Sequence, residues 1–265
     1  MQHSIVLQLN SSDAASVSQN KDSFTVYMQP PIHLPNGASN VYVRVNSAAI
    51  WNTTPNVITS VNDKITMRVS PSAPWIELTV PQGIYNVNQL NETIQRLFAN
   101  SNETAFFTIS ADQSTQRVII NPAFETVEID FTAENSLRNL LGFESSIVGG
   151  TSHIYGTTSP KFTPSYAFNI CTDLVNNGIT TNGVGGRAVA VVPVSEAPGS
   201  LINFSPPNMI PIPCEHLKNS ARQSISVYVT DTANKPLIMF DDWGVVLEIV
   251  YSLPSADSIS SRDWY

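Results

Sequence analysis

The residues best suited to proton transfer or cation binding are two adjacent carboxylates, Asp241 and Asp242. They stand directly before an alternating apolar run that predicts a strand over 243–251. Two carboxylates at the entrance to a strand can hold a hard cation or exchange a proton with a substrate. No partner residue for such chemistry can be named from the sequence, so we interpret the pair as a solvated turn.

The histidines and cysteines do not form a recognisable set of metal ligands. A metal-binding jelly roll of the cupin type needs histidines two positions apart on one strand, whereas these four are widely separated, in surface or loop contexts. Two distant cysteines without a CxxC motif cannot complete a structural zinc site by themselves, and we expect reduced, partly buried thiols. The residues concerned are His3, His33, His153, His216, Cys171 and Cys214.

Familiar catalytic motifs are missing from the chain. There is no Gly-x-Ser-x-Gly elbow, no phosphate-binding Gly-x-x-x-x-Gly-Lys-Ser/Thr loop and no His-Glu-x-x-His zinc motif. Gly183, Gly185 and Gly186 do not fit the spacing of a dinucleotide-binding loop. We therefore expect no enzymatic activity, no catalytic residue, no cofactor and no bound metal.

Composition narrows the class of protein further. The chain has 265 residues, a net charge of −8, only 13% charged residues and 42% apolar residues. This balance predicts a large buried core instead of disorder, and it argues against a protein that binds nucleic acid as its main task. No apolar run is long enough for a transmembrane helix, and the first residues, which alternate like a strand, show no signal-peptide pattern.

Alternation of apolar and polar residues with a period of two is the dominant pattern, and it predicts strands with one buried face. Pro, Asn and Gly separate the runs, as is typical of turns between strands. The wide spacing and long loops favour a jelly roll over an immunoglobulin-like sandwich. The clearest runs cover 24–28, 41–45, 65–69, 76–80, 127–131, 225–229 and 243–251.

Two stretches have helical periodicity. The first covers 87–99, where Val87, Leu90, Ile94, Leu97 and Phe98 share a face and Asn86 or Asn88 can cap the start. The second covers 135–141 and is followed by a glycine at position 142 in the place of a left-handed cap. The fold class is therefore all-β: a single jelly-roll sandwich over 1–265, with two short helices in an insertion around 82–165.

Two further segments are expected at the surface. Residues 145–164 are rich in Ser, Thr and Gly, which indicates an exposed loop or a crossing between halves, with a domain linker as the alternative. Residues 204–213 are apolar and rich in proline, so they cannot form a central strand. This proline-rich segment is either a covered edge or a loop pressed against a partner.

The aromatic pair Trp264 and Tyr265 closes the sequence. Two large aromatic side chains are costly to leave in water, and Trp and Tyr are favoured anchors in protein interfaces. They either fold back on their own domain or dock on a neighbouring chain, which makes them candidate anchors of a subunit interface.

Several short sequence motifs occur together and in a fixed order. They are Pro31-Ile32-x-Leu34, then 52–57, 81–91, 135–143, 225–232, 236–240 and 243–249. The third reads PQGIYNVNQLN and the fourth reads NSLRNLLGF. Together these motifs resemble the penton (minor capsid) proteins of polinton-like viruses, virophages and their adenovirus-side relatives. The resemblance covers most of the chain, from about residue 24 to 252.

The resemblance implies a single jelly roll and a homopentamer that fills the fivefold vertices of an icosahedral capsid, against trimers of the major capsid protein. In some relatives the vertex also holds a fibre or contacts a host receptor. The implied location is the virion, assembled inside the infected cell. No active-site residue, cofactor, specific nucleic acid or transmembrane segment follows from it.

Two other classes of binding or structural protein stay open. One is a major capsid protein with a single or double jelly roll, in which 145–164 would divide two halves. The other is a lectin-like or receptor-binding β-sandwich of a spike, for which Trp51, Trp75 and Asn52 could supply the binding side chains.

Overall fold

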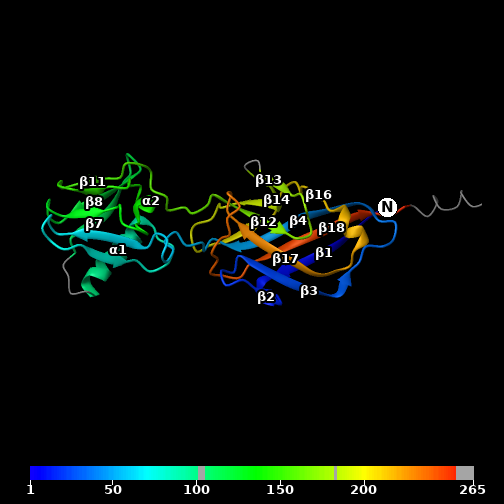
Figure 1. Cartoon of the computed structure of the whole chain (residues 1–265). Helices are drawn as coiled ribbons and strands as arrows, with labels where there is room; N and C mark the ends of the chain where they lie inside the picture. The colour runs from blue at the N-terminus through cyan, green and yellow to red at the C-terminus, as the bar shows by residue number, and fades with distance from the viewer. Residues whose placement is uncertain (101–104, 182–183, 255–265) are drawn as a thin grey trace, which may run out of the picture. The chain divides into compact units, whose positions relative to one another are not determined.

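The computed structural model describes residues 1–100, 105–181 and 184–254. The chain forms two compact units (Figure 1). Unit 1 comprises Met1–Thr54 and Ser165–Tyr265, and unit 2 comprises Pro55–Pro164. Unit 2 therefore enters the chain between two strands of unit 1.

The first sheet of unit 1 has the order β1-β18-β4-β15, and β16 also pairs with β4. All of its pairs are antiparallel. The alternation expected for β4 is present in the structure, because its inward side chains are buried and its outward ones are more exposed. Strand β18 is instead buried at seven of its nine positions. The strands are β1 (Gln2–Asn10), β4 (Ser39–Trp51), β15 (Leu201–Phe204), β16 (Ile212–Pro213) and β18 (Gly244–Ser252).

The second sheet of unit 1 has the order β13-β14-β12-β17-β3-β2, again antiparallel throughout. Two 3₁₀ turns, Ser11–Asp13 and Glu215–Asn219, flank strands of unit 1. The strands are β2 (Ser16–Val17), β3 (Ser23–Ile32), β12 (Ala167–Thr172), β13 (Ile179–Thr181), β14 (Val184–Pro193) and β17 (Arg222–Thr230).

The strand order defines a jelly roll. Counting the eight principal strands along the chain, the first sheet holds the first, eighth, third and sixth, and the second sheet holds the fifth, fourth, seventh and second. Inward side chains of both sheets form one core, which includes Val43, Leu247, Phe24, Ile170 and Val227. The all-β prediction is thus confirmed, and the jelly roll is located in unit 1.

Unit 2 does not repeat this order. It contains a sheet β10-β9-β5-β6 and a smaller sheet β11-β8-β7, with a core of its own. The described residues of the two units therefore do not form the two equal halves of a double jelly roll. The strands are β5 (Lys64–Arg68), β6 (Ile76–Thr79), β7 (Phe107–Asp112), β8 (Arg117–Pro122), β9 (Glu128–Asp130), β10 (Ile147–Gly149) and β11 (Ile154–Tyr155).

A buried asparagine joins the two ends of unit 2. The side-chain amide of Asn56 donates to the carbonyl oxygens of Tyr85, at 2.7 Å, and Phe162, at 2.8 Å, and its own oxygen accepts from the Tyr85 N–H. The entering and leaving segments are thereby tied together. The insertion that we expected around 82–165 overlaps this unit, whose contacts begin at Pro55.

The first helix, α1 (Val87–Asn100), agrees with the prediction. Its apolar face buries Leu90, Ile94 and Phe98 in the core of unit 2. Asn86 caps it: the Asn86 side chain accepts from the Gln89 N–H, and the Gln89 side chain accepts from the Asn86 N–H, a reciprocal capping box. No helix in the described ranges combines the length and the apolar character that crossing a membrane requires.

The second helix, α2 (Arg138–Leu141), is shorter than the predicted 135–141. Asn135 has a positive φ of 57°, its carbonyl accepts from the Lys64 N–H, and the Leu137 N–H donates back to the Lys64 carbonyl. These residues pair with β5 and cannot also form a helical turn. Gly142 is the left-handed cap, as expected, with φ of 78° and its N–H donating to the Arg138 carbonyl.

The interpretation of 145–164 as a loop is partly wrong. Ile147–Gly149 pairs with β9 and Ile154–Tyr155 pairs with β8, so this stretch completes the edges of both sheets of unit 2. Ile154 also joins the buried core. Strands of two or three residues are too short for alternation to reveal them.

Candidate functional site

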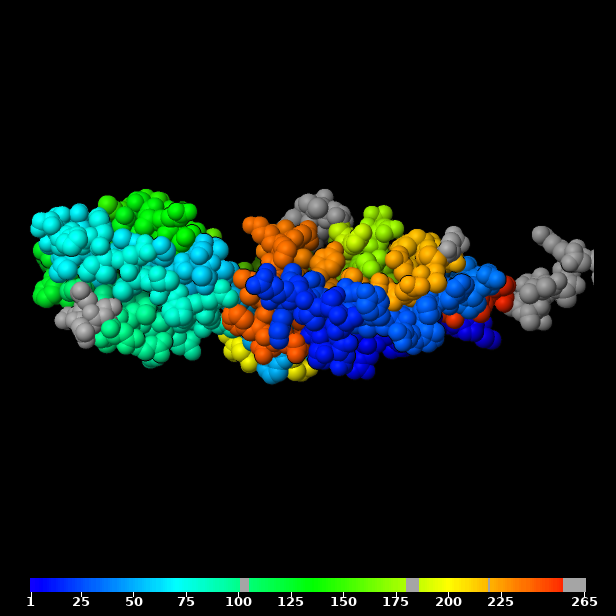
Figure 2. All heavy atoms as spheres, turned by 60° about the horizontal axis from the view of Figure 1, so that its bottom comes forward, coloured from blue at the N-terminus to red at the C-terminus, as the bar shows by residue number. Residues whose placement is uncertain are grey.

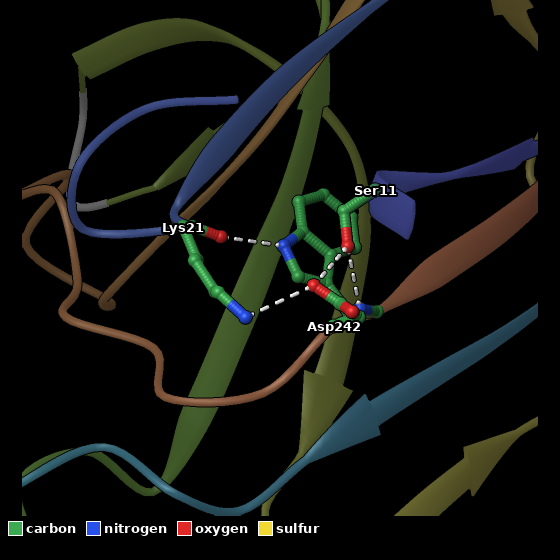
Figure 3. A network of polar contacts seen from close by, with 4 residues as sticks. Ser11, Lys21 and Asp242 are labelled. Atoms are coloured by element: carbon green, nitrogen blue, oxygen red, sulfur yellow. Dashed lines mark hydrogen bonds and ion pairs between the residues drawn. The ribbon is translucent and has the colours of Figure 1, made fainter. Parts of the chain in front are cut away.

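The acidic pair before β18 is part of a structural network (Figure 3). The Asp242 carboxylate accepts a hydrogen bond from Ser11 Oγ at 3.2 Å and pairs with Lys21 Nζ at 3.1 Å. Ser11 and Lys21 belong to the segment between β1 and β3, so Asp242 ties this segment to the start of the last strand. Asp241 is exposed beside it.

The indole of Trp243 completes this network. Its Nε1–H donates to the Lys21 carbonyl at 2.8 Å, and its ring meets Phe24 edge to face with centroids 4.7 Å apart. Figure 2 shows the N-terminal residues, in blue, beside the residues that precede β18, in orange; there the Met239 N–H donates to the Asn20 carbonyl. The arrangement fixes two loops of unit 1, and the exposed Asp242 carboxylate already binds Ser11 and Lys21 within the chain.

The histidines are not brought together. His33 Nδ1 lies 2.8 Å from the Leu34 carbonyl, His153 Nδ1 lies 2.8 Å from Asn121 Oδ1, and the His3 ring stacks on a tyrosine. For His216, burial and then the nearby Arg222 charge lower the pKa. Within the described ranges, no three His, Cys, Asp or Glu side chains are placed to share a metal ion.

Both cysteines are buried in unit 1 and carry free thiols. Burial raises the pKa of the Cys171 thiol to about 11. Burial, together with the negative charge of Glu215, raises the pKa of the Cys214 thiol to about 12. Neither side chain is prepared to act as a nucleophile, because the reactive thiolate is disfavoured.

The side chains considered for a lectin-like site do not form one. Asn52 is buried, and its amide donates to the Glu196 carbonyl at 2.8 Å. Trp51 belongs to unit 1 and Trp75 to unit 2. The guanidinium of Arg68 covers one face of the Trp75 ring, 4.4 Å from its centroid. The other predicted anchors, Trp264 and Tyr265, lie outside the described residues.

The proline-rich segment 204–213 forms an edge of the jelly roll. Its start belongs to β15 and its end to β16, and both pair with β4. Between them the chain leaves the sheet, and Met209 and Ile210 are exposed. The segment therefore lies at an edge, as one of the two predicted alternatives required, but the described residues do not cover its middle.

Beside this segment lies an apolar groove of about 320 Å³. Its floor is formed by core side chains, and its walls come from β14 and from the proline-rich segment. Hereafter it is called the edge groove. It is lined by Val45, Ile179, Val189, Ala190, Val191, Pro193, Phe204, Pro206, Pro207, Asn208 and Ile210.

The chemistry of the edge groove suits an apolar or aromatic side chain. Asn208 is the one lining residue with a polar side chain. A wider hollow of about 530 Å³ near β2 has polar walls whose side chains bind one another, as in the contacts of Thr25 with Ser226 at 2.8 Å and of Ser18 with Asp22 at 2.6 Å. The edge groove is therefore the stronger candidate for an interaction surface.

The sequence indicated one wall of this groove, the proline-rich segment, but not its floor or its opposite wall. The proline-rich segment stood out by composition, whereas Val45 and Val189 looked like ordinary core positions. Their contribution to an open surface depends on the pairing of β14 and β15 into different sheets, which no local pattern reveals.

Similarity to known proteins is found among solved structures. No protein-family model matches the chain, and no curated protein matches it. Among solved structures, the crystal structure of SeMet-labeled mavirus penton protein aligns with 94% of this chain and 98% of its own, at 12% identity and a TM-score of 0.43. Strand order and register, not this similarity, define the fold described above.

Proposed function

We propose that this chain is a structural capsid protein that forms homopentamers at the fivefold vertices of an icosahedral virion, in contact with trimers of the major capsid protein. The observation that carries the proposal is the strand order of unit 1, an eight-stranded jelly roll. Jelly rolls serve mainly as capsid proteins, lectins and cupins. Of these classes, the capsid class agrees best with the described residues.

The resemblance to penton proteins supports the vertex role. Its motifs fall in both units: 81–91 leads into α1 of unit 2, and 225–249 covers most of β17 and β18 of unit 1. Because the matching motifs occur in both the jelly roll and the inserted unit, the resemblance concerns the whole architecture. It does not depend on a single turn that many unrelated proteins share. A fibre or a host receptor belongs to the same proposal as a further partner of the vertex.

A pentamer also suits the physical character of the chain. Five copies meet head to tail, so each copy needs two unlike contact surfaces, and the ring closes by symmetry. With 13% charged residues the chain has few ions to desolvate when such surfaces are buried. We also propose that the chain has no catalytic activity of its own.

The mass of the purified protein in solution tests the proposal. Five copies of the 28.9 kDa chain give about 145 kDa and three copies give about 87 kDa, which native mass spectrometry separates easily. A pentamer is the expected result. A stable trimer would contradict the vertex role and favour a major capsid or spike protein, and a chain that stays monomeric at high concentration would contradict self-assembly.

A further inference from the structure

The edge groove opens directly onto the core of the jelly roll. Val45 and Val189 are each 2% exposed and form its floor, whereas Val191 and Ile210 on its rim are 38% and 58% exposed. Large apolar side chains over such an opening favour burial by a partner. The groove is thus a receptor for side chains that the described residues do not supply.

The residues that line the walls of the edge groove determine which kind of side chain it can bind. Pro193, Pro206 and Pro207 have no backbone N–H, so these positions cannot bind an added strand by donating hydrogen bonds. Their rings form flat apolar surfaces, which suit aromatic rings. Asn208 can bind the polar edge of a Trp or Tyr side chain, since both residues combine an apolar ring with one hydrogen-bonding group.

The chain itself contains a segment with this chemistry. After Pro254 the sequence reads SADSISSRDWY, in which polar residues predominate until the aromatic pair Trp264 and Tyr265. A polar stretch followed by two aromatic residues has the composition of a linker with an anchor, and Trp and Tyr are among the residues enriched in interface hot spots.

We propose that Trp264 and Tyr265 of one copy occupy the edge groove of the neighbouring copy in the ring. This inference rests on the proposed pentamer and names the contact that links its subunits. The groove and the aromatic pair are different parts of one chain, so their union is a head-to-tail contact that repeats around a closed ring.

The length of the segment allows this exchange. Strand β18 ends at Ser252, opposite Ser39 of β4, and the ten residues from Pro254 to Trp264 can extend about 35 Å. To reach the groove of its own copy, the segment would have to turn back along β4 for six residues, about 20 Å, to come level with Val45. A reach of about 35 Å is also long enough to leave the copy, and in the proposed head-to-tail ring the target is the groove of the neighbour.

A matched pair of rim variants in the full-length chain tests the groove. Ile210→Asp places a charge in the groove, whereas Met209→Asp places the same charge on the adjacent exposed residue outside it. We expect Ile210→Asp to raise the dissociation constant of the pentamer at least about tenfold and Met209→Asp to change it less than about twofold. If Ile210→Asp lowers the melting temperature, Val191→Ser on the opposite wall provides the same test.

The aromatic pair is tested together with the groove. Replacing Trp264 and Tyr265 by alanine should weaken assembly as much as Ile210→Asp, and combining the changes should add little, because both remove one contact. A wild-type pentamer whose assembly is unaffected by either change would overturn this inference and leave the proposed function intact. A wild-type chain that forms no pentamer would overturn the proposed function first.

Exchange between copies has a direct readout. A photo-crosslinking amino acid at position 265 is introduced into a mixture of isotopically heavy and light chains. We expect crosslinks to residues 204–210 that join heavy to light peptides. Crosslinks confined to peptides of equal isotopic mass would show docking on the same copy and overturn the inference.

Discussion

Ser11 and Trp243, at opposite ends of the sequence, hold each other by two reciprocal hydrogen bonds. The Ser11 N–H donates to the Trp243 carbonyl at 2.9 Å, and the Trp243 N–H donates to Ser11 Oγ at 3.0 Å. Both residues are buried, at 2% and 3% exposure. The first and last strands of the jelly roll, which pair along their whole length, are thereby also joined at this end.

Removal of the Ser11 hydroxyl tests this junction. Ser11→Ala leaves the buried Trp243 N–H without its acceptor, which should lower the free energy of unfolding by about 1–3 kcal/mol. Urea denaturation followed by circular dichroism measures the change. Ser12→Ala, at the exposed neighbouring position, is the control and should cost less than about 0.5 kcal/mol. Equal effects of the two changes would contradict the role of the hydrogen bond.

Two glycines with nearly the same φ allow the cost of backbone strain to be distinguished from the cost of steric overlap when each is replaced by alanine. Gly142 and Gly150 have φ of 78° and 77°, but a methyl group at Gly142 would overlap the Thr158 carbonyl, whereas nothing lies near that of Gly150. Gly150→Ala should therefore cost about 1–2 kcal/mol, the price of left-handed strain in a non-glycine residue. Gly142→Ala should cost about 3–5 kcal/mol. Thermal unfolding of both variants tests the order, and a smaller loss at Gly142 would contradict the packing described here.

Alternation predicted those strands that bury one face and expose the other, such as β4 and β17. It did not reveal β12, whose six residues Ala167–Thr172 are all buried, because a strand covered on both faces has no polar period. The helix α1 was predictable from its apolar face and capping residue. The start of α2 was not, because pairing with Lys64, far away in the sequence, overrides the local helical preference.

The candidate site, like the fold, was predictable from the sequence only in part. Composition identified the proline-rich segment, since proline restricts a chain to edges regardless of its partners. The pairing of Asp242 with Ser11 and Lys21 connects positions more than 200 residues apart, and the edge groove combines side chains from β4, β14 and the proline-rich segment. Such contacts are set by strand order, and periodicity carries no information about strand order.

The two buried thiols should be unreactive in the folded protein. Cys171 and Cys214 are 3% and 1% exposed, and burial raises the pKa of both thiols, to about 11 and about 12. Because the thiolate is the reactive form, labelling by a disulfide reagent at pH 8 should be at least about a hundredfold slower than for an exposed cysteine. The variant Ser12→Cys, at an exposed position outside the edge groove, supplies that comparison, and denaturant should release both native thiols. Rapid labelling of the folded wild-type chain would contradict the burial of either cysteine.

The ion pair between Arg44 and Glu248 makes stability depend on pH. Arg44 Nε and one of its terminal nitrogens each lie 2.9 Å from Glu248 Oε2, and Glu248 is 8% exposed. Burial acts to raise the pKa of Glu248, but hydrogen bonds from Arg44, Ser4 and Asn46 and the Arg44 charge outweigh it. The pKa of Glu248 therefore lies below its ordinary value of 4.5.

A carboxylate whose pKa is lowered by folding stabilises the protein above its unfolded pKa, and this contribution declines as the pH falls toward the folded value. Glu248→Gln should thus cost about 1–3 kcal/mol at pH 7 and progressively less below pH 4.5. Denaturation curves of both proteins between pH 7 and pH 3 measure the difference. Glu77→Gln, which removes the exposed partner of Lys64, is the control and should have little effect at any pH. A cost of Glu248→Gln that stays constant below pH 4.5 would show that the charge of Glu248 does not contribute, and that the loss comes from packing alone.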